Sequence, residues 1–220
     1  MEGRSEILTI MFIDIAGYTK TTARLGRDSL NTLHETFDNL VLPVFQKYNG
    51  TVIKKIGDAF LITFKSSTDA IWCGIQLQKA FFEHNKAAKS KINIRVALHT
   101  GEVLHRKNDI YGDAVNAAAR IEGVADAGQI VFSESVFLSM NKNEIPFTFL
   151  GSRNLKGLKY PIKLFRVKGR YDDIGKFKKK VKRKISNLFG ALIWMVIIIV
   201  LIGLLIYAFY NYQNWLKLFL

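Results

Sequence analysis

Apolar residues in the first 168 positions follow two different periods. Short apolar runs of four to eight residues, rich in Ile, Val and Phe, are typical of buried strands. Longer segments between them repeat apolar residues every three or four positions, which indicates amphipathic helices. The pattern predicts a helix that starts at Asp28 or Ser29 and is ended by Asn49-Gly50, helices at 68–86 and 113–125, and a short helix through Phe137. It predicts strands at 7–13, 51–56, 59–64, 92–99, 130–133, 147–150 and 162–167.

The order of these elements favours an α+β fold in which helices cover a sheet. Two adjacent predicted strands meet at Gly57-Asp58, so we expect them to form a β-hairpin. A ferredoxin-like βαββαβ core is the natural candidate for residues 1–170, which we treat as one domain. Cys73 is the only cysteine, which excludes an intrachain disulfide, and we expect it in the core.

The chain changes character after residue 170. Leu188–Tyr210 is a run of 23 residues without a charge, and about 20 apolar residues suffice to cross a bilayer. A buried core helix rarely stays apolar on every face over such a length. We therefore expect a single transmembrane helix, with a belt of aromatic residues at its far end, namely Tyr207, Tyr210, Tyr212 and Trp215.

Basic residues gather on one side of this apolar run. Seven of the nine residues in Lys176–Lys184 are Lys or Arg, whereas only Lys217 follows the run. The positive-inside rule predicts a single-pass protein of the cytoplasmic membrane, with the N-terminal domain in the cytoplasm and 211–220 as a short extracytoplasmic tail. We expect the linker 171–187 to face anionic lipid rather than nucleic acid, because the adjacent apolar helix already explains its charge.

Two aspartates stand at the edges of apolar runs. Asp14 lies in the segment 12–19, FIDIAGYT, and Asp58 ends the segment 54–58, KKIGD. Carboxylate oxygens held in this way can bind paired Mg²⁺ or Mn²⁺ ions, and such a pair can clamp the attacking and leaving oxygens of a phosphoryl transfer. Taken alone, an aspartate in a Gly-Asp turn is more commonly a turn residue.

A third segment, 109–120, reads DIYGDAVNAAAR and places Asn116 and Arg120 four apart on one face of a predicted helix. In order and in spacing, the three segments resemble the signature of class III nucleotidyl cyclases, the adenylate and guanylate cyclase catalytic domain, over about residues 6–168. The resemblance implies that family's ferredoxin-like fold with extra C-terminal strands. It also implies a homodimer, in which one subunit supplies the metal aspartates and the other supplies the Asn and Arg.

The resemblance assigns a metal site and a phosphate loop. Asp14, Ile15 and Asp58 match the part of the motifs that holds two Mg²⁺ or Mn²⁺ ions. Gly17, Tyr18 and Thr19 match the loop that contacts the triphosphate. Backbone N–H groups in such a loop could cradle phosphate oxygens, and a glycine permits close approach.

Lys54 and Asp109 match the two positions that select the base in this family. A Lys there can donate to adenine N1 and an Asp can accept from the N6 amino group, whereas guanylate cyclases carry a Glu and usually a Cys. Buried polar groups left unpaired by the wrong base would reject it strongly. The two residues therefore favour ATP, unless each is merely an exposed charge, as the neighbouring Lys55 suggests.

Asn116 and Arg120 match the pair that orients the ribose and stabilises charge developing on the phosphate. The alternative is that Arg120 forms an ordinary ion pair with Glu122 or Glu134. Lys156 resembles a basic residue that contacts the terminal phosphates, although it has nearby rivals in Arg153, Lys159 and Lys163. Two histidines without ligand spacing favour packing or surface roles over a metal site, namely His99 and His105.

The leading interpretation is a membrane-tethered adenylate cyclase that converts ATP to 3′,5′-cyclic AMP and pyrophosphate by two-metal-ion catalysis in a homodimer. One alternative is a guanylate or pyrimidine cyclase, which Lys54 and Asp109 disfavour. Another is a nucleotide-binding membrane module without catalysis. Occupation of every family position considered above argues against that module.

Overall fold

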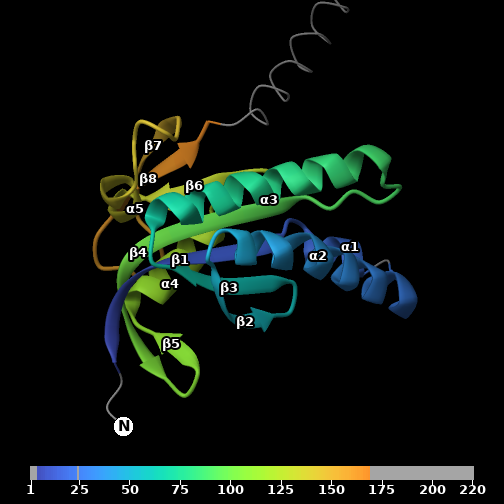
Figure 1. Cartoon of the computed structure of the whole chain (residues 1–220), viewed down its shortest axis with the longest axis horizontal. Helices are drawn as coiled ribbons and strands as arrows, with labels where there is room; N and C mark the ends of the chain where they lie inside the picture. The colour runs from blue at the N-terminus through green and yellow to red at the C-terminus, as the bar shows by residue number, and fades with distance from the viewer. Residues whose placement is uncertain (1–3, 24, 169–220) are drawn as a thin grey trace, which may run out of the picture. The chain divides into compact units, whose positions relative to one another are not determined.

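The computed structural model describes residues 4–23 and 25–168. These residues form an eight-stranded mixed sheet with helices on both of its faces (Figure 1). The strands are β1 (Ser5–Ile15), β2 (Thr51–Ile56), β3 (Ala59–Phe64), β4 (Ile94–Arg106), β5 (Asp109–Tyr111), β6 (Ile130–Ser133), β7 (Phe147–Arg153) and β8 (Ile162–Val167). The helices are α1 (Tyr18–Thr22), α2 (Arg27–Lys47), α3 (Ser67–Ala87), α4 (Asp113–Glu122) and α5 (Glu134–Ser139).

Strand β1 lies inside the sheet and pairs antiparallel with β3 on one side and β4 on the other. The strand order is β2-β3-β1-β4-β6-β8-β7, and β5 pairs with β4 beside this path. The order β4-β1-β3-β2 is that of a ferredoxin-like core, with β6, β8 and β7 added next to β4. The predicted α+β class and the hairpin at Gly57-Asp58 are thus confirmed.

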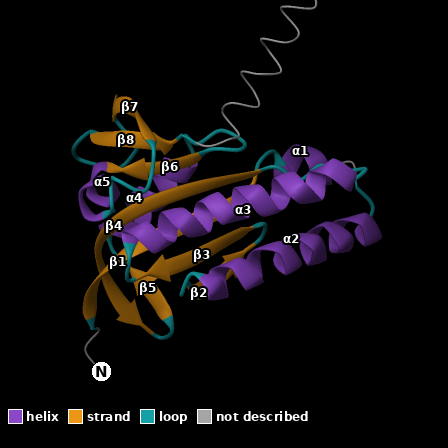
Figure 2. Cartoon of the chain, turned by 45° about the horizontal axis from the view of Figure 1, so that its top comes forward, coloured by secondary structure: helices purple, strands orange, loops and turns teal. Residues whose placement is uncertain are grey.

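The alternation of side chains along β1 divides the core into two layers. Met11 and Ile13 are buried on the face that α2 and α3 cover, where these two helices run side by side (Figure 2). Ile10 and Phe12 are buried on the opposite face, beneath the small residues of α4, Ala114 and Ala118. Because a strand points successive side chains to opposite faces, one continuous apolar run serves both layers.

Three features of the sheet differ from the predictions, and one is β7, which continues past residue 150 to Arg153. Strand β4 continues past His99 to Arg106. Every residue of β1 pairs with β4, from Ile15 opposite Ile94 to Ser5 opposite Leu104, and this pairing extends β4 beyond its predicted end. The short strand β5 was not predicted, since three residues carry too little pattern to reveal a strand. The predicted helix at 113–125 ends at Glu122.

The predicted linker 171–187, the basic run within it, the transmembrane helix 188–210 and the tail 211–220 lie outside the described residues. Within the part of the chain that the structure describes, no helix has the length and apolar character needed to span a bilayer.

Candidate functional site

Asp14 and Asp58 lie together at one end of the sheet. Asp14 is the last residue but one of β1 and is paired with Ala59, the first residue of β3. Asp58 precedes Ala59 in the tight β2–β3 turn, where Gly57 adopts a left-handed φ of 61°. Burial raises the pKa of Asp58, and the charge of Asp14 acts in the same direction, against hydrogen bonds from the Asp58 and Ile15 amides.

Two further charged residues complete this group, and both were missed in the sequence. Arg95 lies opposite Asp14 in the register of β1 and β4, and its Nε and Nη2 donate to the two Asp14 carboxylate oxygens at 3.0 and 2.7 Å. Arg95 Nε also lies 2.5 Å from Glu122 Oε1 at the end of α4. This second contact is an ion pair rather than a hydrogen bond, because the single Nε–H is directed at Asp14.

We call Asp14, Asp58, Arg95 and Glu122 the acidic cluster. Burial and a hydrogen bond with Asp14 raise the pKa of Glu122 to about 7, while Arg95 acts against the shift. The hydrogen bonds that Arg95 donates to Asp14 raise the pKa of Arg95 above its ordinary value. Three carboxyl groups therefore share one guanidinium, which is a setting that attracts a cation.

The acidic cluster fits a divalent metal by its donor chemistry. Asp14 and Asp58 offer hard carboxylate oxygens from adjacent strand ends, and Mg²⁺ commonly uses one or two carboxylates together with substrate phosphates. Within residues 4–23 and 25–168, no set of three or more His, Cys, Asp or Glu side chains is arranged as a complete metal centre. A metal here would accordingly need oxygens from a bound phosphate, and Arg95 would have to release Asp14.

The predicted phosphate loop follows Asp14 directly. Gly17 adopts a φ of 77°, and open space surrounds its Cα where a side chain would lie. The Ala16 N–H is already used, because it donates to the Asn93 carbonyl at 2.8 Å. The side chain of Ile15 is buried in the core, so only its backbone can face a ligand. The Tyr18 hydroxyl lies 2.9 Å from His34 Nε2 at the side of the loop.

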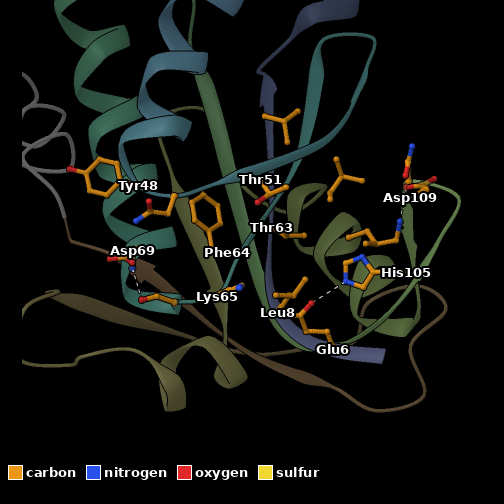
Figure 3. A pocket seen from close by; sticks show the side chains of 16 residues that line it. Glu6, Leu8, Tyr48, Thr51, Thr63, Phe64, Lys65, Asp69, His105 and Asp109 are labelled. Atoms are coloured by element: carbon orange, nitrogen blue, oxygen red, sulfur yellow. Dashed lines mark hydrogen bonds and ion pairs between the residues drawn. The ribbon is translucent and has the colours of Figure 1, made fainter. Parts of the chain in front are cut away.

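Lys54 and Asp109 lie 55 residues apart in sequence and meet in the structure. Lys54 Nζ lies 2.6 Å from Asp109 Oδ2, and the Ile110 N–H donates to the other oxygen at 2.8 Å. The hydrogen bond from Lys54 lowers the pKa of Asp109. Asp109 lines a cavity of about 770 Å³, with Tyr48 toward the opposite end and Thr51 and Thr63 between them (Figure 3).

Asn116 and Arg120 are exposed on α4. Asn116 lines a second cavity, of about 880 Å³, together with Lys159, whereas Lys156 is exposed in the adjacent turn. Neither the Asn116 nor the Arg120 side chain makes a hydrogen bond or ion pair with another described residue. The alternative ion pair of Arg120 is therefore not seen, since Glu122 pairs with Arg95 and Glu134 with Lys163.

Glu122 and Arg120 lie on different sides of helix α4. Residues two apart on an α-helix lie about 200° apart around its axis. Glu122 points to Arg95 within its own chain, and Arg120 therefore points away from the acidic cluster. The fold brings Asp14 to Asp58 and Lys54 to Asp109, but it does not bring Arg120 to the acidic cluster of the same chain.

Each of the two histidines lines one of the two cavities, His105 the first and His99 the second. Burial lowers the pKa of His99 to about 4, and its Nδ1 lies 3.5 Å from the Ser135 hydroxyl. His105 Nε2 lies 3.3 Å from a Glu6 carboxylate oxygen on the neighbouring strand. Neither belongs to a group of metal-binding side chains in the described part of the chain.

A family model described as the adenylate and guanylate cyclase catalytic domain matches residues 2–169. The serine/threonine-protein kinase pkn2 of Myxococcus xanthus is 34% identical over 161 residues, which cover 72% of this chain and 19% of that protein. The putative adenylate cyclase 3 of Rhizobium meliloti is 27% identical over 165 residues, which cover 74% of this chain and 28% of that protein. The chain thus spans less than a third of either relative.

A solved structure extends the likeness to three dimensions. The crystal structure of an adenylate/guanylate cyclase/hydrolase from Silicibacter pomeroyi has a TM-score of 0.69 at 28% identity, over 76% of this chain and 99% of that chain. Both the family and this structure are named for adenylate and guanylate together. The base that this chain accepts does not follow from the likeness.

Proposed function

The chain belongs to the adenylate and guanylate cyclase catalytic domain family, and from this premise we propose that it is an adenylate cyclase acting as a homodimer. The reaction would join the ribose 3′-oxygen of ATP to the α-phosphorus. The bond from that phosphorus to the bridging oxygen would break, pyrophosphate would leave, and the 3′-hydroxyl proton would pass to solvent or to pyrophosphate. One ATP then yields one 3′,5′-cyclic AMP.

The observation that carries the proposal is the separation of two residue sets within one chain. Asp14 and Asp58 lie in the acidic cluster, whereas Arg120 points away from it on an exposed face of α4. We call Lys54, Asp109, Asn116 and Arg120 the surface set. A two-fold dimer would place the surface set of one chain against the acidic cluster of its partner and would make two equivalent sites.

Each residue has a role in the proposed site. Two Mg²⁺ or Mn²⁺ ions, when bound by Asp14 and Asp58, would supply Lewis-acid stabilisation of the triphosphate and of the attacking oxygen. Arg95 would have to release at least one Asp14 oxygen to such a metal. The partner subunit would contribute Asn116 to orient the ribose and Arg120 to stabilise charge developing on the phosphate.

The preference for ATP rests on the Lys54–Asp109 contact. Lys54 can donate to the unprotonated N1 of adenine, and Asp109 can accept from the N6 amino group. Guanine presents an N1–H donor and an O6 acceptor at the same positions, so both contacts would be mismatched. The contact of 2.6 Å between the two side chains supports this proposal, because groups this close could contact a single base edge.

We further propose that Leu188–Tyr210 anchors the enzyme in the cytoplasmic membrane and that Lys176–Lys184 faces its anionic surface. The support is the 23-residue uncharged run and the seven basic residues before it. The catalytic domain would then face the cytoplasm, where ATP is present.

Product analysis of the full-length chain in detergent tests the proposal. The protein would be incubated separately with ATP, GTP, CTP and UTP, each with Mn²⁺ or Mg²⁺. We expect cyclic AMP from ATP as the main product, and its loss in Asp58→Asn. Cyclic GMP as the main product would overturn the base assignment, whereas nucleotide binding without any cyclic product would favour a non-catalytic module.

A further inference from the structure

Helix α4 contributes Glu122 to the acidic cluster and also carries Asn116 and Arg120 of the surface set. Its last residue, Glu122, contacts Arg95, while Arg120 points to the opposite side. In the proposed homodimer, the acidic cluster of a chain belongs to one active site and Arg120 of the same chain belongs to the other. The same short helix therefore takes part in both active sites.

The contacts of Arg95 must change when the acidic cluster binds a metal. Its guanidinium holds both carboxylate oxygens of Asp14, at 3.0 and 2.7 Å. These are the oxygens that a divalent ion would need, so Arg95 has to leave at least one of them. The partner that remains within reach is Glu122, 2.5 Å from Arg95 Nε and joined through α4 to Arg120.

We propose that Arg95 and Glu122 are positioning residues that couple the two active sites of the dimer; this inference rests on the proposed function. With a metal and nucleotide held at Asp14, Arg95 would pair with Glu122 alone. That pairing would hold α4, and with it Asn116 and Arg120, in place for the other site. The first ligand therefore strengthens binding of the second.

The size of the effect follows from ordinary coupling energies. Coupling between sites typically changes an affinity about 5- to 150-fold. Even a fivefold gain at the second of two equal sites gives a Hill coefficient of about 1.4. Such a value is readily distinguished from 1.0 in a binding isotherm.

The test measures binding as well as turnover. The full-length chain in detergent would be titrated with Mn²⁺ and α,β-methylene-ATP, which cannot release pyrophosphate, and followed by calorimetry. Initial rates would be measured separately against Mn²⁺–ATP. The variant is Glu122→Gln, which removes the charge that faces Arg95. Its matched control is Glu134→Gln on α5, which removes the exposed ion pair between Glu134 and Lys163 of β8.

We expect a Hill coefficient of about 1.4 or more in the wild type and in Glu134→Gln. Glu122→Gln should still form cyclic AMP, with a Hill coefficient of 1.0. Arg95→Lys, which loses the bidentate fork, should also lose the coupling. A catalytically active wild type without cooperativity, or cooperativity retained in Glu122→Gln, would overturn this inference alone. A wild type that binds the analogue but forms no cyclic product would instead overturn the proposed function.

Discussion

Asp14, Arg95 and Glu122 contact one another within a single chain, whereas Asn116 and Arg120 have no side-chain partner among the described residues. The first group is assembled from β1, β4 and α4 before any ligand arrives, and its charges are partly buried. The second stays on the surface, so the entropy cost of ordering its side chains falls on the step that brings a ligand or partner. In the proposed homodimer, a single chain would provide two unlike halves of an active site, each incomplete alone.

The test with the largest expected effect damages one half in one chain and the other half in a second chain. Asp14→Ala and Arg120→Ala should each lower cyclase activity about a thousandfold, because each removes charge that stabilises the transition state. Co-expressed in equal amounts, the two chains should form heterodimers in which one site is intact. Half of the dimers would be mixed, so about a quarter of the wild-type rate should return.

The control pairs Asp14→Ala with Asp58→Ala. Both changes lie in the acidic cluster, so every dimer would lack an intact site and no activity should return. Activity that fails to return with Arg120→Ala, in dimers shown to be mixed by two affinity tags, would mean that the halves are not shared between subunits.

A second test addresses the base-selecting role proposed for Lys54 and Asp109. Lys54→Glu combined with Asp109→Cys installs the residues that guanylate cyclases carry. We expect kcat/KM for ATP to fall about a hundredfold or more and the preference to move to GTP, because unpaired polar groups oppose the wrong base. The measurement is competition between ATP and GTP in one reaction.

Lys55→Glu is the matched control for that substitution. Lys55 adjoins Lys54 but pairs with Asp38, with distances of 2.6 and 2.7 Å to its two oxygens. The same Lys-to-Glu substitution there should leave the ratio of cyclic AMP to cyclic GMP as it was. An equal shift in both variants would point to net charge rather than to base recognition.

The same two regions differ in how far the sequence could predict them. Asp14 lies at a strand end and Asp58 in a turn, as their local patterns predicted, whereas Asp109 lies in the unpredicted strand β5. Local periods also predicted four of the five described helices, all except α1, and most strands, because a buried face requires them. Short motifs and hydrophobic periodicity both involve residues close together in the sequence, so both can be recognised without the structure.

Arg95 and Glu122 could not be predicted in this way. The contact of Arg95 with Asp14 depends on the register of β1 against β4, which are 81 residues apart at this point. The contact with Glu122 depends on how α4 docks on the opposite face of the sheet. The sequence offered only two weak signs of this contact. Arg95 is a charged residue near the start of a buried strand, and Glu122 follows Arg120 by two residues.

A third test uses two groups whose pKa values shift in opposite directions. The pKa of Glu122 is raised from 4.5 to about 7, so its contribution to stability is complete below pH 4.5 and is lost as pH rises through 7. The pKa of His99 is lowered from 6.5 to about 4, so its contribution is complete above pH 6.5 and is lost as pH falls through 4. Each shift corresponds to at most about 3 kcal/mol of unfolding free energy.

In metal-free wild type the two contributions should largely cancel between pH 4 and 7. Relative to wild type, Glu122→Gln should gain stability as pH rises, whereas His99→Asn should lose it, each by about 1–3 kcal/mol. Urea unfolding with a chelator at four pH values would measure both. Parallel curves for all three proteins would show that the local environments of these groups do not set the pH dependence.

The smallest expected effect concerns the basic turn beside α4. Lys156 matches a phosphate-binding position, yet Lys159 lines the cavity that contains Asn116. If Lys156 binds the terminal phosphates, Lys156→Ala should raise KM for ATP about tenfold, the worth of one charge-assisted hydrogen bond. Lys163→Ala is the control, because Lys163 is engaged with Glu134 at 2.8 Å. A rise in KM for Lys159→Ala but not for Lys156→Ala would assign the phosphate contact to Lys159 instead. The contact would then lie in the same cavity as Asn116, on the surface proposed to meet the partner subunit.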